Sequence, residues 1–242
     1  MTDYGVGLAM EGRLMDYAQR SGGQAAPVGA FPLSPAQQSM WLAQRLNPEV
    51  PLNIAMFIEF DQEIDVAVLS RASEQAGREF GSGYLRIVEV DGTPFQFVDR
   101  EIDDHIVTID FSREPDPRAA AMSFMRRDYS APIDLLEDRL AVSYVLTVDA
   151  GHQLWYTRMH HVTIDGFGAT TMLNRAAEIY SALVSGDASQ HKPTDTLREL
   201  YEHDAAYRQS GRFRSTVSTG ATTRQISRTL CPLRLSPHRL PR

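Results

Sequence analysis

The sequence predicts an α+β fold, an α/β sandwich in which helices pack on a mixed or antiparallel sheet. Stretches with the apolar period of an amphipathic helix alternate with short runs rich in β-branched and aromatic residues. Two pairs of those runs are separated by turn sequences, Asp91-Gly92 and Asp149-Ala150-Gly151, which indicate hairpins. The chain has 242 residues, 43% of them hydrophobic, and can therefore bury a sizeable core.

The organised part is expected to begin near Phe31. Ser34 before Pro35 is typical of a helix start, because serine caps the first N–H groups and proline suits the first helical position. Asp65 is expected to cap the next helix in the same way. The expected elements are helices over 35–46, 66–80, 117–129 and 168–184, and strands over 54–60, 84–90, 94–98, 106–111, 141–148 and 153–160.

Charge divides the chain into unlike parts. Of 24 basic and 31 acidic residues, eight arginines and no acidic residue lie beyond Ala206, so residues 1–206 carry −15 and residues 207–242 carry +8. We expect a flexible leader over 1–30 that opens with a helix, a folded lobe over 31–213, and an aberrant or disordered basic tail over 214–242. Lys192 is the only lysine, which indicates GC-rich coding, and a shifted reading frame in such DNA yields Arg-, Ser- and Pro-rich sequence.

Composition argues against several classes of protein. No apolar run has the length of a membrane span and no secretory signal opens the chain, so we expect no membrane partner. The single cysteine, Cys231, favours a reducing, cytoplasmic setting. The basic C-terminal residues raise nucleic-acid binding as an alternative. It is the least favoured one, because Tyr207 and Phe213 are the only aromatic residues among residues 207–242.

The densest chemical motif lies at residues 159–168, between an expected strand and an expected helix. Neighbouring strand residues point to opposite faces, so one of His160 and His161 faces a cleft while the other packs behind it. Asp165 is placed to fold back across the loop. We expect Gly166 and Gly168 to let the backbone turn sharply before the helix, whose N-terminus supplies partial positive charge.

This motif suits acyl transfer, because a neutral imidazole accepts a proton from an attacking amine or hydroxyl near neutral pH. Asp165 either orients an imidazole or pairs with an arginine and holds the loop. The alternative is structural, with one histidine buried and the aspartate capping the helix. A metal site is disfavoured because no further ligands occur at suitable spacing, and a serine triad lacks its G-x-S-x-G elbow.

Three short segments, residues 160–166, 33–42 and 132–135, resemble sequence motifs of the condensation domains of nonribosomal peptide synthetases. Residues 160–166, His-His-Val-Thr-Ile-Asp-Gly, are similar to the family's HHxxxDG motif. Residues 33–42, Leu-Ser-Pro-Ala-Gln-Gln-Ser-Met-Trp-Leu, resemble its opening S-x-A-Q-x-x-x-W segment, and residues 132–135, Pro-Ile-Asp-Leu, resemble a stretch that precedes its central hairpin. The resemblance as a whole extends over roughly residues 31–205.

The resemblance implies a chloramphenicol-acetyltransferase-like lobe, with a mixed sheet and helices packed on it. It implies amide formation in secondary-metabolite biosynthesis, in which an amine on one carrier protein attacks a thioester on another. His161 would act at the reacting centre, His160 would support the loop, Asp165 would be mainly structural, and Gly166 would border the reacting atoms. Substrates would arrive on phosphopantetheine arms, so neither a bound cofactor nor a metal is expected.

Two departures from the family pattern bear on function. The family's R-H-E-x-L-R motif is expected near residues 79–86, where only the closing Leu85-Arg86 remains, and this leaves ester formation or another acyl transfer as alternatives. A condensation domain also has two lobes with a tunnel between them. We expect this chain to be the N-terminal lobe and to be inactive alone. The further alternative is a non-catalytic module that binds carrier proteins or a partner lobe.

Overall fold

The computed structural model describes residues 26–102, 105–186 and 196–213. The expected tail over 214–242 and most of the expected leader lie outside these residues. The chain divides into a unit that ends at Arg198 and one that begins at Glu199, and the site lies in the first. The elements are β1 (Phe31–Pro32), α2 (Pro35–Leu46), β2 (Asn53–Phe60), α3 (Val66–Phe80), the short 3-10 helix η1 (Ser82–Tyr84), β3 (Leu85–Val90), β4 (Thr93–Val98), β5 (Val107–Asp110), α4 (Pro117–Ser130), β6 (Ala141–Asp149), β7 (His152–His160), α5 (Gly166–Ser185) and α6 (Leu197–Gln209).

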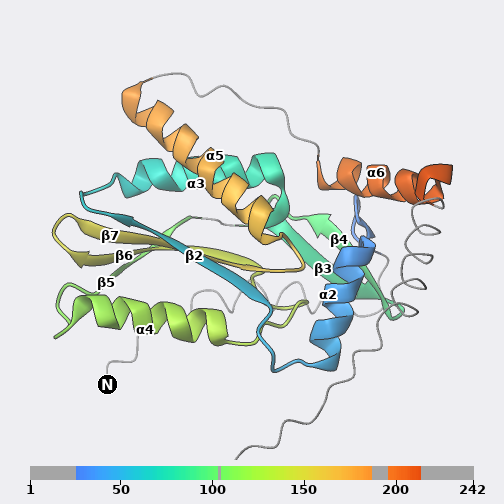
Figure 1. The fold of residues 1–242 in the computed structure, drawn as a ribbon, viewed down its shortest axis with the longest axis horizontal. Coiled ribbons are helices and arrows are strands. Elements are labelled where there is room, and N and C mark those ends of the chain that lie inside the picture. The colour runs from blue at the N-terminus through green and yellow to red at the C-terminus, as the bar shows by residue number, and fades with distance from the viewer. Residues whose placement is uncertain (1–25, 103–104, 187–195, 214–242) are drawn as a thin grey trace, which may run out of the picture. The chain divides into compact units, whose positions relative to one another are not determined.

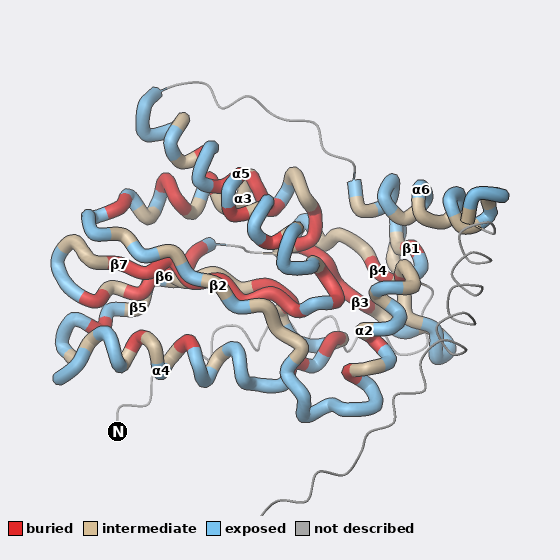
Figure 2. Tube along the Cα trace, in the orientation of Figure 1, coloured by how far each residue is buried: buried red, intermediate tan, exposed pale blue. Residues whose placement is uncertain are grey.

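The first unit is a layered α/β structure, which confirms the predicted fold class. Its larger sheet has the strand order β2-β7-β6-β5, with β7 antiparallel to both neighbours and β5 parallel to β6. Helices α3 and α5 cover one face of this sheet and α4 covers the other (Figure 1). Because β7 is a central strand covered on both faces, eight of its nine residues are buried (Figure 2).

Separate hydrophobic clusters fill the two sides of the larger sheet. The cluster toward α3 and α5 consists of Ile64, Leu69, Ala72, Ala76, Ile106, Val145, Trp155, Leu173, Ala176 and Ile179. The cluster toward α4 consists of Phe111, Ala121, Met125, Leu146, Val148, Leu154 and Tyr156. An ion pair joins α3 to α5, since Arg175 Nε lies 2.7 Å from Glu79 Oε2 and both side chains are less than a tenth exposed. Packing on this face therefore fixes α5 against α3.

The smaller sheet has the order β1-β4-β3 and is antiparallel throughout. The predicted turn between β3 and β4 is confirmed: Asp91 and Gly92 have φ angles of 49° and 76°, the left-handed pair that a two-residue hairpin turn requires. Helix α2 also agrees with the sequence. Ser34 and Gln37 form a capping box and Pro35 is the first helical residue, so the helix spans the predicted 35–46.

Three features of the local structure differ from what the sequence predicted. Gly166 and Gly168 do not form a sharp turn, because both lie in the first turn of α5 and neither has a positive φ. The chain reverses earlier, where the Thr163 N–H donates to the His160 carbonyl over 2.9 Å. Asp165 caps α5 and so starts the helix two residues before the predicted boundary. Helix α6, which lacks a buried residue in the described chain, was not predicted.

Candidate functional site

The two histidines at the end of β7 have opposite environments. His160 is fully buried, whereas His161 is exposed. The backbone N–H of His160 donates to the carbonyl of Leu140, just before β6. The backbone N–H of His161 donates to the carbonyl of Leu52, just before β2. The sheet thus holds the backbone of both residues while their side chains point to opposite sides, as the alternation along a strand requires.

His160 is held by hydrogen bonds at both ring nitrogens. Its Nε2 lies 3.1 Å from Gln44 Oε1, and its Nδ1 accepts a hydrogen bond from the Val162 N–H over 3.0 Å. Burial, with smaller contributions from the charges of His161 and Arg158, lowers the pKa of His160 to about 4. His160 is therefore neutral near pH 7 and has no nitrogen free for a substrate.

His161 is the histidine that solvent and a substrate can reach. Its backbone N–H donates to the Leu52 carbonyl over 2.9 Å. Within the described part of the chain, no hydrogen bond engages its ring. The sequence left open whether Asp165 orients an imidazole, and the structure places the Asp165 carboxylate elsewhere, with Oδ1 accepting from the Gly168 N–H over 2.7 Å. Asp165 is thus a helix cap, the structural role that the sequence allowed.

Two glycines in the first turn of α5 serve different purposes. A Cβ at Gly168 would lie 2.8 Å from Ile164 Cγ1, so packing demands glycine there. A Cβ at Gly166 would meet no atom within 4 Å. Phe167 between them is 83% exposed. The space at Gly166 and the side chain of Phe167 are accordingly open to a ligand or another polypeptide.

Three glutamines support the histidine loop, and the sequence reasoning assigned a role to none of them. Gln37 and Gln96 form a reciprocal amide pair at 2.7 Å, and Gln37 Nε2 also donates to the Val162 carbonyl over 3.1 Å. Gln44 is buried and contacts His160. Gln37 and Gln44 are seven residues apart, which places both on one face of α2. Two glutamines at this spacing on the buried face of a helix were the sequence signal that could have predicted their supporting role.

The other motif residues have structural roles. Arg86, the last residue of the altered 79–86 segment, is buried and donates to the Asp138 carbonyl over 3.2 Å. Ile133 and Leu135 of the Pro-Ile-Asp-Leu stretch pack with Trp41 of α2. Asp134 between them accepts the Leu136 N–H over 2.8 Å. These segments brace α2 and β3.

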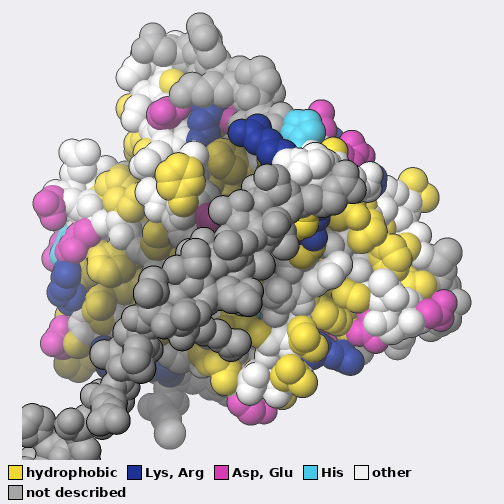
Figure 3. All heavy atoms as spheres, turned by 45° about the vertical axis from the view of Figure 1, so that its right-hand side comes forward, with side chains coloured by type: hydrophobic (Ala, Val, Ile, Leu, Met, Phe, Trp, Pro, Cys, Tyr) yellow, Lys and Arg dark blue, Asp and Glu magenta, His cyan; other side chains and the backbone are white. Residues whose placement is uncertain are grey.

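Exposed hydrophobic side chains also occur on α2, where Leu42 and Leu46 are 57% and 70% exposed. Figure 3 shows hydrophobic side chains in several groups on one face, interrupted by charged side chains. None of the helices in the described ranges is long and apolar enough to cross a membrane.

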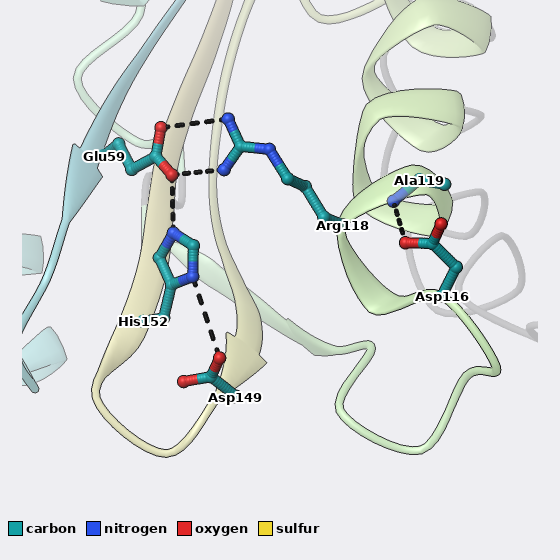
Figure 4. Close-up of polar contacts among 6 residues, drawn as sticks. All are labelled: Glu59, Asp116, Arg118, Ala119, Asp149 and His152. Carbon is teal, nitrogen blue, oxygen red and sulfur yellow. Dashed lines mark hydrogen bonds and ion pairs between the residues drawn. The ribbon is translucent and has the colours of Figure 1, made fainter.

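A second polar cluster occupies the opposite end of β7 (Figure 4). Glu59 of β2 pairs with Arg118 of α4 and with His152, whose Nε2 lies 2.6 Å from Glu59 Oε1. The bond from Arg118, with a smaller effect from His152, lowers the pKa of Glu59 to about 2. Asp149 lies 3.8 Å from the other ring nitrogen of His152. The cluster is an ion-pair network that ties α4 to the sheet.

These two ends of β7 cannot act together. His152 and His160 are the first and last residues of the strand. Eight residues at about 3.3 Å each separate them by roughly 26 Å. In the parts of the chain that the structure describes, no three histidine, cysteine or acidic side chains are grouped as metal ligands are. The loop that carries His161 is therefore the candidate site.

The chain, including this loop, is similar to a known protein family and to several known proteins. The family model described as "Condensation domain" matches residues 28–217. Among curated proteins, the isonitrile lipopeptide synthase of Streptomyces coeruleorubidus is 34% identical over 184 residues, which is 75% of this chain and 12% of that protein. The dimodular nonribosomal peptide synthase of Bacillus subtilis (strain 168) is 32% identical over 76% of this chain and 8% of its own length.

Solved structures agree with this similarity. The starter condensation domain of rhizomide synthetase RzmA is 32% identical with a TM-score of 0.70, over 75% of this chain and 44% of that one. The first condensation domain of the CDA synthetase is 28% identical with a TM-score of 0.65, over 77% of this chain and 48% of that one. The chain spans less than half of each of these condensation domains and a small part of the curated synthases it matches.

Proposed function

The chain belongs to the condensation-domain family of nonribosomal peptide synthetases, and we propose that it is the histidine-bearing N-terminal lobe of a domain that forms amide bonds. In the proposed reaction, an amine bonds to the carbonyl carbon of a thioester and the carbon–sulfur bond breaks. The amine loses a proton and the sulfur leaves as a thiol. Carrier proteins would present both substrates on phosphopantetheine arms, in the cytoplasm.

The observation that carries this proposal is the difference between the environments of the two histidine side chains. His161 is exposed, and its ring is unengaged by described residues, whereas His160 is buried and bonded at both nitrogens. In the proposed mechanism His161 takes the proton of the attacking amine, or orients that amine, beside the space at Gly166. The N-terminal end of α5, capped by Asp165, adds partial positive charge near the developing oxyanion.

Ester formation or another acyl transfer is the alternative that the altered 79–86 segment leaves open. Arg86, which that segment retains, is used to brace the Asp138 carbonyl. An acceptor substrate with a hydroxyl group would give its proton to the same histidine, His161, because hydroxyl and amine nucleophiles both lose a proton on attack. Comparing amine-bearing and hydroxyl-bearing acceptors, with the product identified by mass, decides between these two chemistries.

Catalysis by His161 is tested in a complete condensation domain that contains this lobe, with loaded donor and acceptor carriers. We expect His161→Ala to lower product formation by about a hundredfold or more, the scale of a lost general base. His152→Ala is the matched control, since it removes a histidine from the far end of the same strand and should leave turnover unchanged. Undiminished product from His161→Ala would instead favour a non-catalytic module that binds carriers or a partner lobe.

We further propose that the isolated chain has little or no activity. It spans 44% of the RzmA starter condensation domain, and the missing lobe would supply the opposite wall of the reaction tunnel. A site open to water loses the preorganised electrostatics on which such catalysis depends. Robust turnover by the 242-residue chain alone would refute this point and leave the role of His161 intact.

A further inference from the structure

The orientation of the Gln44 side chain is determined by its surroundings. Its Nε2 lies 3.3 Å from the Asn47 carbonyl oxygen, 3.1 Å from that of Pro48 and 3.2 Å from that of Val50. Carbonyl oxygens only accept hydrogen bonds, so the NH₂ group must face them. The reversed amide would set its own oxygen against three others. Gln44 Oε1 therefore faces the ring of His160.

This orientation fixes the tautomer of His160. Gln44 Oε1 only accepts, so His160 Nε2 must carry the ring hydrogen. On the other side of the ring, the Val162 N–H donates to Nδ1, which must then carry a lone pair. A proton on Nδ1 would place two donors face to face. The two contacts together allow only the neutral ring with hydrogen on Nε2.

The ring in this tautomer holds the backbone that presents His161. Nδ1 anchors the Val162 N–H, and the Val162 carbonyl is held by Gln37 Nε2 over 3.1 Å. The Thr163 hydroxyl and N–H both donate to the His160 carbonyl, at 2.8 and 2.9 Å. The peptide units on either side of Val162 are thus tied to α2 through Gln37 and Gln44, which lie two helical turns apart.

We propose that Gln44 is a positioning residue for the reaction at His161: it locks His160 in the Nε2–H tautomer, and that ring holds the loop on which His161 is presented. The inference rests on the proposed function for its effect on turnover, but the tautomer lock itself does not depend on catalysis. Gln44 touches no reacting atom and acts only through His160.

The tautomer lock is tested by ¹⁵N NMR of the histidine rings in the 242-residue chain. We expect His160 to be protonated at Nε2 alone and to stay so from pH 8 to pH 5. In Gln44→Met, which keeps a similar volume but makes no hydrogen bond, we expect a second tautomer or protonation of Nδ1 in this range. Gln38→Met is the control, because the Gln38 side chain donates only to the Leu33 carbonyl among described residues and lies on the same helix. A wild-type ring protonated at Nδ1 would overturn the inference.

The effect on the reaction is tested in the complete domain. We expect Gln44→Met to lower kcat by about tenfold to a hundredfold, as a misplaced reacting group does, with KM for both carriers unchanged. Gln38→Met should change neither. If Gln44→Met does not fold, Gln44→Asn takes its place, because it keeps the amide but is one methylene too short to span both sets of partners. An unchanged kcat with a lost tautomer lock overturns the positioning role, whereas full activity of His161→Ala contradicts the proposed function itself.

Discussion

At the scale of single residues, the adjacent histidines show how position decides chemistry. His160 is fully buried, neutral and bonded at both nitrogens, while its neighbour His161 is exposed. The low pKa of His160, about 4, follows chiefly from burial, which disfavours the charged ring. A residue with this pKa supports the loop without exchanging protons near pH 7.

This pKa makes folding depend on pH. The unfolded chain protonates this histidine below its ordinary pKa of about 6.5, whereas the folded chain does so only near 4. The unfolded state therefore binds more protons, and stability falls as pH falls between these values. From pH 7 to pH 5 we expect His160 to reduce the free energy of unfolding by about 2 kcal/mol.

Urea unfolding of the wild type and of His160→Asn at both pH values measures this contribution. Asparagine retains an acceptor for the Val162 N–H but does not titrate. The variant should be less stable at pH 7 and should lose about 2 kcal/mol less than the wild type on acidification. Equal losses in the two proteins would contradict a buried, neutral His160.

At the scale of elements, the residues at the start of α5 determine where this helix begins and how closely it packs. Asp165 caps the helix, Gly168 accepts the close approach of Ile164, and Gly166 leaves open space. Further along, Arg175 binds Glu79 of α3 and holds the helix in place. The sequence predicted this helix and its glycines, but it assigned the glycines to a turn, because it could not show that the chain reverses at His160–Thr163 instead.

The two glycines of α5 predict opposite results for the same substitution. Gly168→Ala pushes a methyl group into Ile164 and should cost about 1–3 kcal/mol of stability. Gly166→Ala meets open space in a helical position and should be neutral or stabilising by up to about 1 kcal/mol. In the complete domain, Gly166→Ala should still lower turnover, because the methyl group enters the space assigned to the substrate.

Chemical denaturation of the two variants side by side checks the stability difference, and carrier-to-carrier turnover checks the loss of function. Similar destabilisation by both substitutions would show that the first turn of α5 is packed differently. A fully active Gly166→Ala would remove this glycine from the reacting centre.

At the scale of the molecule, one strand organises the first unit. β7 is the buried central strand; it ends at the histidine loop and begins at the Glu59–Arg118–His152 cluster. The clusters of core residues on both faces of the sheet come from residues 64–179. The lobe predicted over 31–213 thus has its core well inside its own bounds.

We therefore expect a chain that ends at Phe213 to fold as the 242-residue chain does. Its urea midpoint and the steepness of its transition should match, since both follow from the apolar surface buried in the core. The same comparison tests the interpretation of residues 214–242 as aberrant sequence. A loss of more than about 1 kcal/mol on truncation would assign that segment a part in folding.

The sequence by itself determined the features that depend on near neighbours. Ser34 and Asp65 started their helices where expected, and Asp91-Gly92 made its hairpin turn, because capping and turn geometry involve only a few adjacent residues. The same local rule required His160 and His161 to face opposite sides. The resemblance of three short motifs to condensation domains then led to the family.

Only the tertiary structure decided which residues meet across the chain. Gln44 and His160 are 116 positions apart, and Glu79 and Arg175 are 96 apart. It also decided that His160 is the buried histidine, that β5 runs parallel to β6, and that Asp165 caps a helix instead of orienting an imidazole. The physical reason is that these contacts arise when whole elements pack, and no local pattern of side chains encodes the partner that packing brings to each.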